Sequence, residues 1–260
     1  MIATRPALPA AFLDRPIAHR GLHDRALGRP ENSRAAVRAA VAAGYGIELD
    51  VRCSADGVAM VFHDAALMRL AGRREALDSL SADALAATPL KDGAEGIPRL
   101  SEVLALVAGR APLLIEMKDR SGCYRGSDRL LERAVAAALA GYGGPVAVMS
   151  FNPDMVAGMA ECAPKLARGL TTGAWHLREA LRISPAYRRH LRAIADFDRS
   201  GASFISHQCS DLSRKRVRQL RAQGVPVLCW TVRTPRSERR AREGADNITF
   251  EGYSPDHTTA

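Results

Sequence analysis

The residues with the clearest chemical potential are charged side chains spaced two apart in two apolar runs. Glu48 and Asp50 lie in the run IELDV, and Glu116 and Lys118 lie in the run IEMK. In a β-strand, side chains two residues apart point to the same face. Each run therefore presents two charged groups on one face near the end of an apolar strand, where burying an unpaired charge is costly.

Three of these charged groups have the chemistry of a metal site. A divalent cation bound by Glu48, Asp50 and Glu116 would compensate three carboxylates that face one another inside an apolar fold. An all-oxygen set of ligands favours Mg²⁺ or Ca²⁺ over zinc. Each pair alone is explained as well by polar residues at a strand end, so the prediction rests on the combination of the three.

Two further segments contain histidines beside charged residues. His19 and Arg20 lie in IAHRG, which is followed by PENS, and His63 lies in VFHD. Imidazole exchanges protons near neutral pH and therefore serves as a general acid or base. Taken singly, His19 has the alternative of a satisfied core histidine, and His63 that of a surface turn residue.

The elements that would position these residues alternate between short β-rich runs and helical stretches rich in Ala, Leu and Arg. This alternation is typical of an α/β fold with a parallel sheet. Strands are expected at 16–20, 46–51, 112–118, 146–151, 166–171, 203–207, 225–232 and 245–250. Helices are expected at 33–43, 101–107, 127–140, 154–163, 175–198, 210–223 and 235–243.

Eight strands separated by helices predict a (β/α)₈ TIM barrel, and 260 residues suit a single domain of this kind over residues 1–260. An open doubly wound sheet is the alternative. Its dinucleotide-binding form is disfavoured because no G-x-G-x-x-G turn follows the first strand. Only residues 251–260 remain after the last strand, so the eighth helix is expected to be short or missing.

One extended run, residues 58–63, does not fit the alternation. Only residues 52–57 separate it from the preceding strand, whereas a parallel crossover needs about a dozen residues. The intervening Ala-Asp-Gly is a hairpin-turn signal. We therefore predict an antiparallel excursion that returns His63 and Asp64 over the carboxyl ends of the barrel strands, followed by a small insertion at 65–98.

The composition limits the classes of partner. The formal charge is +9, and its basic residues cluster at 178–192, 214–221 and 233–242. These clusters are interpreted as solvated faces of outer helices, because no aromatic residues interleave with them as nucleic-acid binding would require. No nucleic-acid partner is expected, and the oligomeric state is left open.

The location of the protein is also predicted from composition. No apolar run reaches the length of a membrane span, and the N-terminus lacks the apolar stretch of a secretory signal. The five cysteines are scattered without a C-x-x-C pair, which fits a reducing compartment. We therefore expect a cytoplasmic protein with no stable membrane insertion.

In this order, the motifs IAHRG, PENS, ELDV, VFHD, IEMK, SF and WTV resemble those of the glycerophosphodiester phosphodiesterase family, from residue 17 to about residue 248. The resemblance implies a TIM barrel with a divalent metal held by the three carboxylates named above. It implies acid–base catalysis by His19 and His63, and it places Arg20 and Lys118 near the phosphate. Which histidine is the acid and which the base is left open.

The resemblance also points to secondary positions. Phe151 follows Ser150 in a family pattern and is expected to line the substrate pocket, as is Trp230, for which a core position is the alternative. Asn32 is a candidate for reaching the site, although a helix-capping role explains it as well. Phe250 stands where many relatives carry Asp, which puts the polar lining on that side in question.

The implied activity is metal-dependent hydrolysis of a glycerophosphodiester, a small-molecule substrate, to glycerol 3-phosphate and an alcohol. Two alternatives remain: a phosphodiesterase of the lysophospholipase D type acting on a lipid, and a non-catalytic phosphate-binding barrel. The second alternative predicts loss of a catalytic or metal-binding residue, and all of these residues are present.

Overall fold

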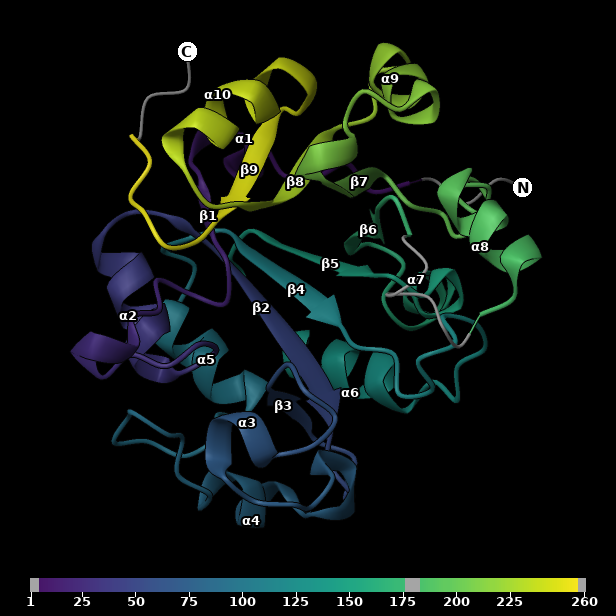
Figure 1. Cartoon of the computed structure of the whole chain (residues 1–260). Helices are drawn as coiled ribbons and strands as arrows, with labels where there is room; N and C mark the ends of the chain where they lie inside the picture. The colour runs from purple at the N-terminus through teal and green to yellow at the C-terminus, as the bar shows by residue number, and fades with distance from the viewer. Residues whose placement is uncertain (1–4, 176–182, 257–260) are drawn as a thin grey trace.

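The computed structural model describes residues 5–175 and 183–256, and its centre is a closed barrel of parallel strands (Figure 1). The strands follow the order β1-β9-β8-β7-β6-β5-β4-β2, and pairing between β1 and β2 closes the ring. They are β1 (Ile17–Ala18), β2 (Gly46–Cys53), β4 (Leu113–Met117), β5 (Val146–Ser150), β6 (Ala167–Thr172), β7 (Phe204–Gln208), β8 (Val227–Val232) and β9 (Asn247–Phe250). The predicted (β/α)₈ fold is confirmed.

Helices surround the barrel between successive strands. They are α2 (Arg34–Ala42), α5 (Leu100–Val107), α6 (Leu130–Leu139), α7 (Pro153–Cys162), α8 (Pro185–Arg192), α9 (Lys215–Ala222) and α10 (Pro235–Gly244). Within the described part of the chain, no helix follows β9, as expected for a short or missing eighth helix.

Two predicted helices differ from the structure. The long helical region at 175–198 lies partly outside the described residues, and its described part holds the shorter helix α8. The helix at 210–223 begins later than predicted, because a 3₁₀ turn, η4 (Cys209–Asp211), precedes α9. Leu212, next to this turn, is buried, so packing of the turn displaces the start of the helix.

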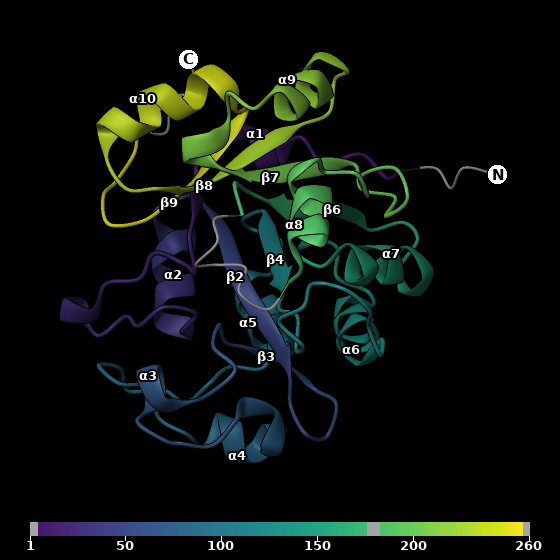
Figure 2. The same ribbon diagram turned by 45° about the vertical axis from the view of Figure 1, so that its right-hand side comes forward.

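The predicted antiparallel excursion is present. Strand β3 (Ala59–Val61) pairs with β2 in antiparallel register, with Val61 opposite Val51. The elements α3 (Met68–Ala71), η2 (Leu77–Ser79) and α4 (Ala82–Ala86) follow β3 before α5. Figures 1 and 2 show α3 and α4 beside the β2–β3 hairpin, on the opposite side of the molecule from α9 and α10. The division into one domain with an insertion at 65–98 stays a prediction.

An apolar layer fills the amino-terminal end of the barrel. Phe12, on the short helix α1 (Ala11–Asp14), packs in a buried cluster with Ile17, Leu114, Phe204 and Leu228. A side chain at Gly169 would meet the Phe204 ring at 2.4 Å, so the glycine leaves room for this ring. The apolar layer leaves the charged residues on the same strand faces at the carboxyl end of the barrel.

Asn247 ties the segment that closes the barrel to the last strand. Its buried side-chain amide donates to the carbonyl oxygens of Phe12 and Arg15 at 2.7 and 2.6 Å. Two main-chain carbonyl groups thus depend on one side chain for their hydrogen bonds.

We expect Asn247→Ala to destabilise the protein by about 2–4 kcal/mol, because it leaves two carbonyl groups without donors. Equilibrium unfolding in urea measures this loss. Gln219→Ala, which removes an exposed amide on α9, is the matched control and should change stability little. Equal stability of the two variants would contradict this role of Asn247.

Candidate active site

A pocket of about 170 Å³ lies at the carboxyl end of the barrel and gathers the predicted site residues. Its lining includes His19, Arg20, Glu48, Asp50, His63, Glu116, Lys118, Phe151 and Trp230. Every residue that the sequence analysis assigned to catalysis, phosphate binding or metal ligation therefore lies in one place.

The three carboxylates meet because two neighbouring strands are in register. Asp50 on β2 is paired with Glu116 on β4, and Glu48 lies two residues earlier on the same face of β2. One oxygen from each carboxylate lies within 4.8 Å of the others. Glu48 and Asp50 are each 1% exposed and Glu116 is 7% exposed, so the cluster is buried.

Electrostatic compensation within this cluster is uneven. Burial, together with the charges of Asp50 and Glu116, raises the pKa of Glu48 well above its usual value. Burial opposes ionisation of Asp50 as well, but the charges of Lys118, His63 and Arg20 hold its pKa below the usual value.

Two cations account for this difference. The Lys118 ammonium lies 2.5 Å from Glu116 and 3.3 Å from Asp50, and the Arg20 guanidinium lies 3.1 Å from Asp50. Burial would lower the pKa of Lys118, but the charges of Glu116 and Asp50 raise it overall. Three carboxylates face two cations, so an uncompensated negative charge remains near Glu48, and the donor set fits a hard divalent cation.

Both histidines have a carboxylate on Nδ1. His19 Nδ1 lies 2.5 Å from Glu251, and His63 Nδ1 lies 2.7 Å from Asp64. A carboxylate at Nδ1 holds the proton on that nitrogen and leaves the Nε2 lone pair free. His19 Nε2 lies 3.9 Å from Glu48, at the edge of the acidic cluster. Burial lowers the pKa of His19, although its hydrogen bond to Glu251 acts in the opposite direction.

Asn32 contacts the acidic cluster directly. Its amide donates to Asp50 Oδ2 at 2.9 Å, and its side-chain oxygen accepts from the Asp50 backbone N–H at 3.2 Å. The N-cap of α2 is instead Ser33, whose hydroxyl accepts from the Ala36 N–H. The helix-capping alternative for Asn32 is therefore wrong, because its neighbour carries out that role.

An aromatic wall closes one side of the pocket. The rings of Phe151 and Trp230 lie 5.4 Å apart at nearly a right angle, and the Lys118 ammonium lies 6.0 Å from the centre of the Phe151 ring. Trp230 donates its indole N–H to the Ser206 carbonyl, which fixes the ring. Both aromatic residues line the pocket, so Trp230 is not confined to the core.

The sequence analysis missed Glu251, whose carboxylate bonds His19 on one side and Arg233 at 2.6 Å on the other. Phe250 does not determine the polar lining on that side of the pocket. Phe250 points away from the pocket and packs against Tyr45, with ring centres 4.8 Å apart. Strand alternation carries the signal, since Thr249 lines the pocket and Glu251 lies two residues further along.

Glu31 lies beside the site, whereas His207 does not line it. Glu31 accepts from Arg20 at 2.6 Å and also from Arg69, which in turn bonds Asp64. This network links the two histidine-bearing segments. His207 bonds Thr172 and Asp211 away from the pocket lining, so its role is structural.

The comparison with protein families identifies the family to which the chain belongs. The model of the glycerophosphoryl diester phosphodiesterase family matches residues 19–249. The chain belongs to this family. The protein is accordingly a phosphodiesterase, as the resemblance of its motifs predicted.

Several known proteins are similar to the chain along most of its length. The glycerophosphodiester phosphodiesterase of Caldanaerobacter subterraneus subsp. tengcongensis is 29% identical over 246 residues, which are 89% of this chain and 91% of that protein. The structure of the Agrobacterium tumefaciens enzyme has a TM-score of 0.65 and 25% identity, covering 90% of this chain and 95% of its own. An Oleispira antarctica phosphodiesterase, solved with the product sn-glycerol-3-phosphate, has a TM-score of 0.72 at 23% identity and covers 92% of this chain and 94% of its own.

Among residues 5–175 and 183–256, no helix combines the length and hydropathy required to cross a bilayer. The cytoplasmic location and the absence of a nucleic-acid partner stay predictions of the sequence.

We expect Glu251→Gln to lower kcat for a phosphodiester substrate about 10- to 100-fold, because the charged partner that orients His19 is lost. Steady-state kinetics measure the effect, with the exposed Glu243→Gln on α10 as the control for loss of a carboxylate. If the two variants keep the same kcat, Glu251 does not position His19.

Proposed function

We propose that the protein hydrolyses glycerophosphodiesters to glycerol 3-phosphate and an alcohol, with a divalent metal ion and two histidines. The observation that carries the proposal is the convergence of three buried carboxylates within 4.8 Å of one another in a pocket that His19 and His63 also line. A non-catalytic barrel would have no need to keep a cluster whose charges oppose burial.

In this proposal, Glu48, Asp50 and Glu116 hold Mg²⁺ or Ca²⁺. A bound divalent cation supplies Lewis-acid polarisation of a phosphoryl oxygen. Asn32 orients Asp50 through its two hydrogen bonds, and the Arg20 backbone N–H donates to Glu48 at 2.9 Å. These contacts fix two of the three ligands before the metal binds.

The remaining residues bind the phosphate and move protons. Arg20 and Lys118 bind the phosphate oxygens and offset the negative charge that develops in the transition state. A neighbouring hydroxyl of the glycerol arm attacks phosphorus while one histidine accepts its proton at Nε2, and the other histidine donates a proton to the oxygen of the departing alcohol. Water then opens the resulting cyclic phosphate to give glycerol 3-phosphate. The carboxylates of Glu251 and Asp64 keep both Nε2 atoms in the required orientation.

The size and walls of the pocket support glycerol 3-phosphate as the part of the substrate held there. A pocket of about 170 Å³ accepts a group of this size, and Phe151 and Trp230 offer an apolar wall to the glycerol carbons. The product found in the Oleispira antarctica phosphodiesterase is the same compound.

The test is release of glycerol 3-phosphate from glycerophosphodiesters, measured with a coupled enzymatic assay. We expect EDTA to abolish release, and Mg²⁺ or Ca²⁺ to restore it. His19→Ala and His63→Ala should each lower kcat by at least about 100-fold, because each removes a proton-transfer group.

His190→Ala on α8, which removes a histidine whose imidazole bonds Asp196 outside the pocket, is the matched control and should keep normal turnover. Full activity in EDTA would contradict the requirement for a metal ion. Near-normal turnover in His19→Ala or His63→Ala would contradict the catalytic role of that histidine.

A further inference from the structure

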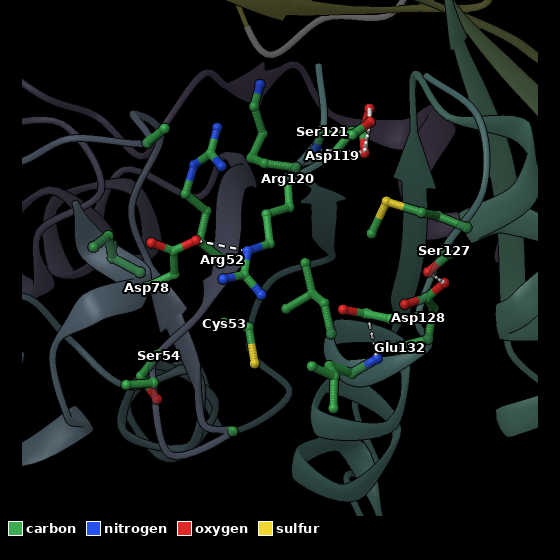
Figure 3. Close-up of a pocket in the computed structure, with 18 of the residues that line it drawn as sticks. Arg52, Cys53, Ser54, Asp78, Asp119, Arg120, Ser121, Ser127, Asp128 and Glu132 are labelled. Carbon is green, nitrogen blue, oxygen red and sulfur yellow. Dashed lines mark hydrogen bonds and ion pairs between the residues drawn. The ribbon is translucent and has the colours of Figure 1, made fainter. Parts of the chain in front are cut away.

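A second and larger cavity adjoins the active site. It has a volume of about 770 Å³ and lies between the β2–β3 hairpin, the loop after β4 and the first turn of α6 (Figure 3). Ala65, Leu77 and Asp78, which follow β3, and Met155 on α7 complete its lining. Its volume falls in the range of ligand sites, whereas the catalytic pocket of about 170 Å³ is smaller than that range.

The two cavities share a wall. Lys118 lines both of them. Arg52, which lines the larger cavity, donates to the carbonyl oxygen of His63 at 2.7 Å. A phosphodiester has two organic arms, so when one arm and the phosphate occupy the catalytic pocket, the second arm can pass Lys118 into the larger cavity.

Opposite walls of this cavity offer complementary hydrogen-bonding groups. Figure 3 shows Arg52 and Arg120 on the hairpin side and Ser127, Asp128 and Glu132 on the side of α6. Arg120 forms an ion pair with Asp78 at 2.7 Å. Within the described part of the chain, Arg52 forms no ion pair, and its side chain donates only through Nε, to the His63 carbonyl oxygen. Its terminal N–H groups are therefore free to donate to a ligand.

Glu132 provides a second, independent indication of a ligand. Its side chain is fully buried, and one carboxylate oxygen accepts from the Ser127 hydroxyl at 2.5 Å. The other oxygen has no hydrogen-bond partner among the described residues. A buried acceptor without a donor is unfavourable, and a ligand hydroxyl at this wall would satisfy it.

The residues that line the cavity favour some classes of alcohol over others as the second arm of the diester. An acyl chain would cover the apolar part of the lining, but it would also strip water from arginines and carboxylates without replacing their hydrogen bonds. A quaternary ammonium group binds best over aromatic rings, and none of the described residues that line this cavity is aromatic. An anionic arm would meet the carboxylates of Asp119, Asp128 and Glu132. A cationic arm would meet Lys118, Arg120 and Arg125, so charges of both signs in the lining favour an uncharged arm.

A polyhydroxylated arm fits both walls, because each hydroxyl donates and accepts. Apolar residues of the lining, such as Cys53, Leu131 and Met155, suit the C–H face of a sugar or cyclitol ring. We infer that this cavity binds the second arm of the diester, and that this arm is an uncharged polyhydroxylated alcohol. The inference rests on the proposed glycerophosphodiesterase function.

The test compares sn-glycero-3-phosphoinositol with sn-glycero-3-phosphocholine. Leu130, the first residue of α6, lines the cavity and is 44% exposed, so Leu130→Trp fills part of it without disturbing the core. Met68, the first residue of α3, is 46% exposed and lines neither cavity, which makes Met68→Trp the matched control.

We expect kcat/KM of the unmodified enzyme to be at least about tenfold higher for the inositol diester, as two or three additional hydrogen bonds would give. Leu130→Trp should remove most of this preference by raising KM for the inositol diester alone, and Met68→Trp should preserve it. Equal or greater preference for choline, or an equal loss for both diesters in Leu130→Trp, would overturn the inference.

Binding distinguishes this inference from the proposed function. Calorimetric titration of the EDTA-treated protein with each diester requires no turnover. If the inositol diester binds more tightly and Leu130→Trp removes this difference, the cavity assignment is supported, even when neither diester is hydrolysed. Absence of hydrolysis would refute the proposed function alone. Equal affinity for the two diesters would refute the cavity assignment.

Discussion

Repulsion among three buried carboxylates is the constraint on which the rest of the site depends. Two like charges about 4 Å apart interact by about 4 kcal/mol at an effective dielectric constant of about 20, a sizeable part of the 5–15 kcal/mol that stabilises a typical domain. Lys118 and Arg20 compensate Asp50 and Glu116, whereas the raised pKa of Glu48 reflects the charge that remains. A divalent cation accounts for this arrangement, because it turns an unfavourable cluster into a ligand set.

The barrel brings the three carboxylates together because side chains alternate between the inner and outer faces of its strands. On strand β4, the side chains that point inward are apolar at the amino end and polar at the carboxyl end, since Leu114 is followed by Glu116. Closure between β1 and β2, and between β1 and β9, brings His19 beside both Glu48 and Glu251. The β2–β3 hairpin returns His63 to the same pocket. Segments from both ends of the chain thus complete one site.

Strand periodicity made much of this site predictable. The two-residue spacing in β2 and β4 placed Glu48, Asp50, Glu116 and Lys118 on inward faces, and the short separation before β3 predicted the hairpin. Glu251 was missed because a family motif, rather than strand alternation, directed attention to Phe250. The larger cavity was not predicted, since irregular segments such as the loop after β4 line it, and their side-chain directions follow no period.

Anomalous diffraction from a crystal soaked in Mn²⁺ tests the central claim most directly, because Mn²⁺ accepts the same oxygen ligands as Mg²⁺. The account predicts one strong peak in the barrel mouth, within about 2.5 Å of an oxygen from each of Glu48, Asp50 and Glu116. A peak that contacts none of these carboxylates, or no peak there at a Mn²⁺ concentration that fully supports turnover, would contradict it.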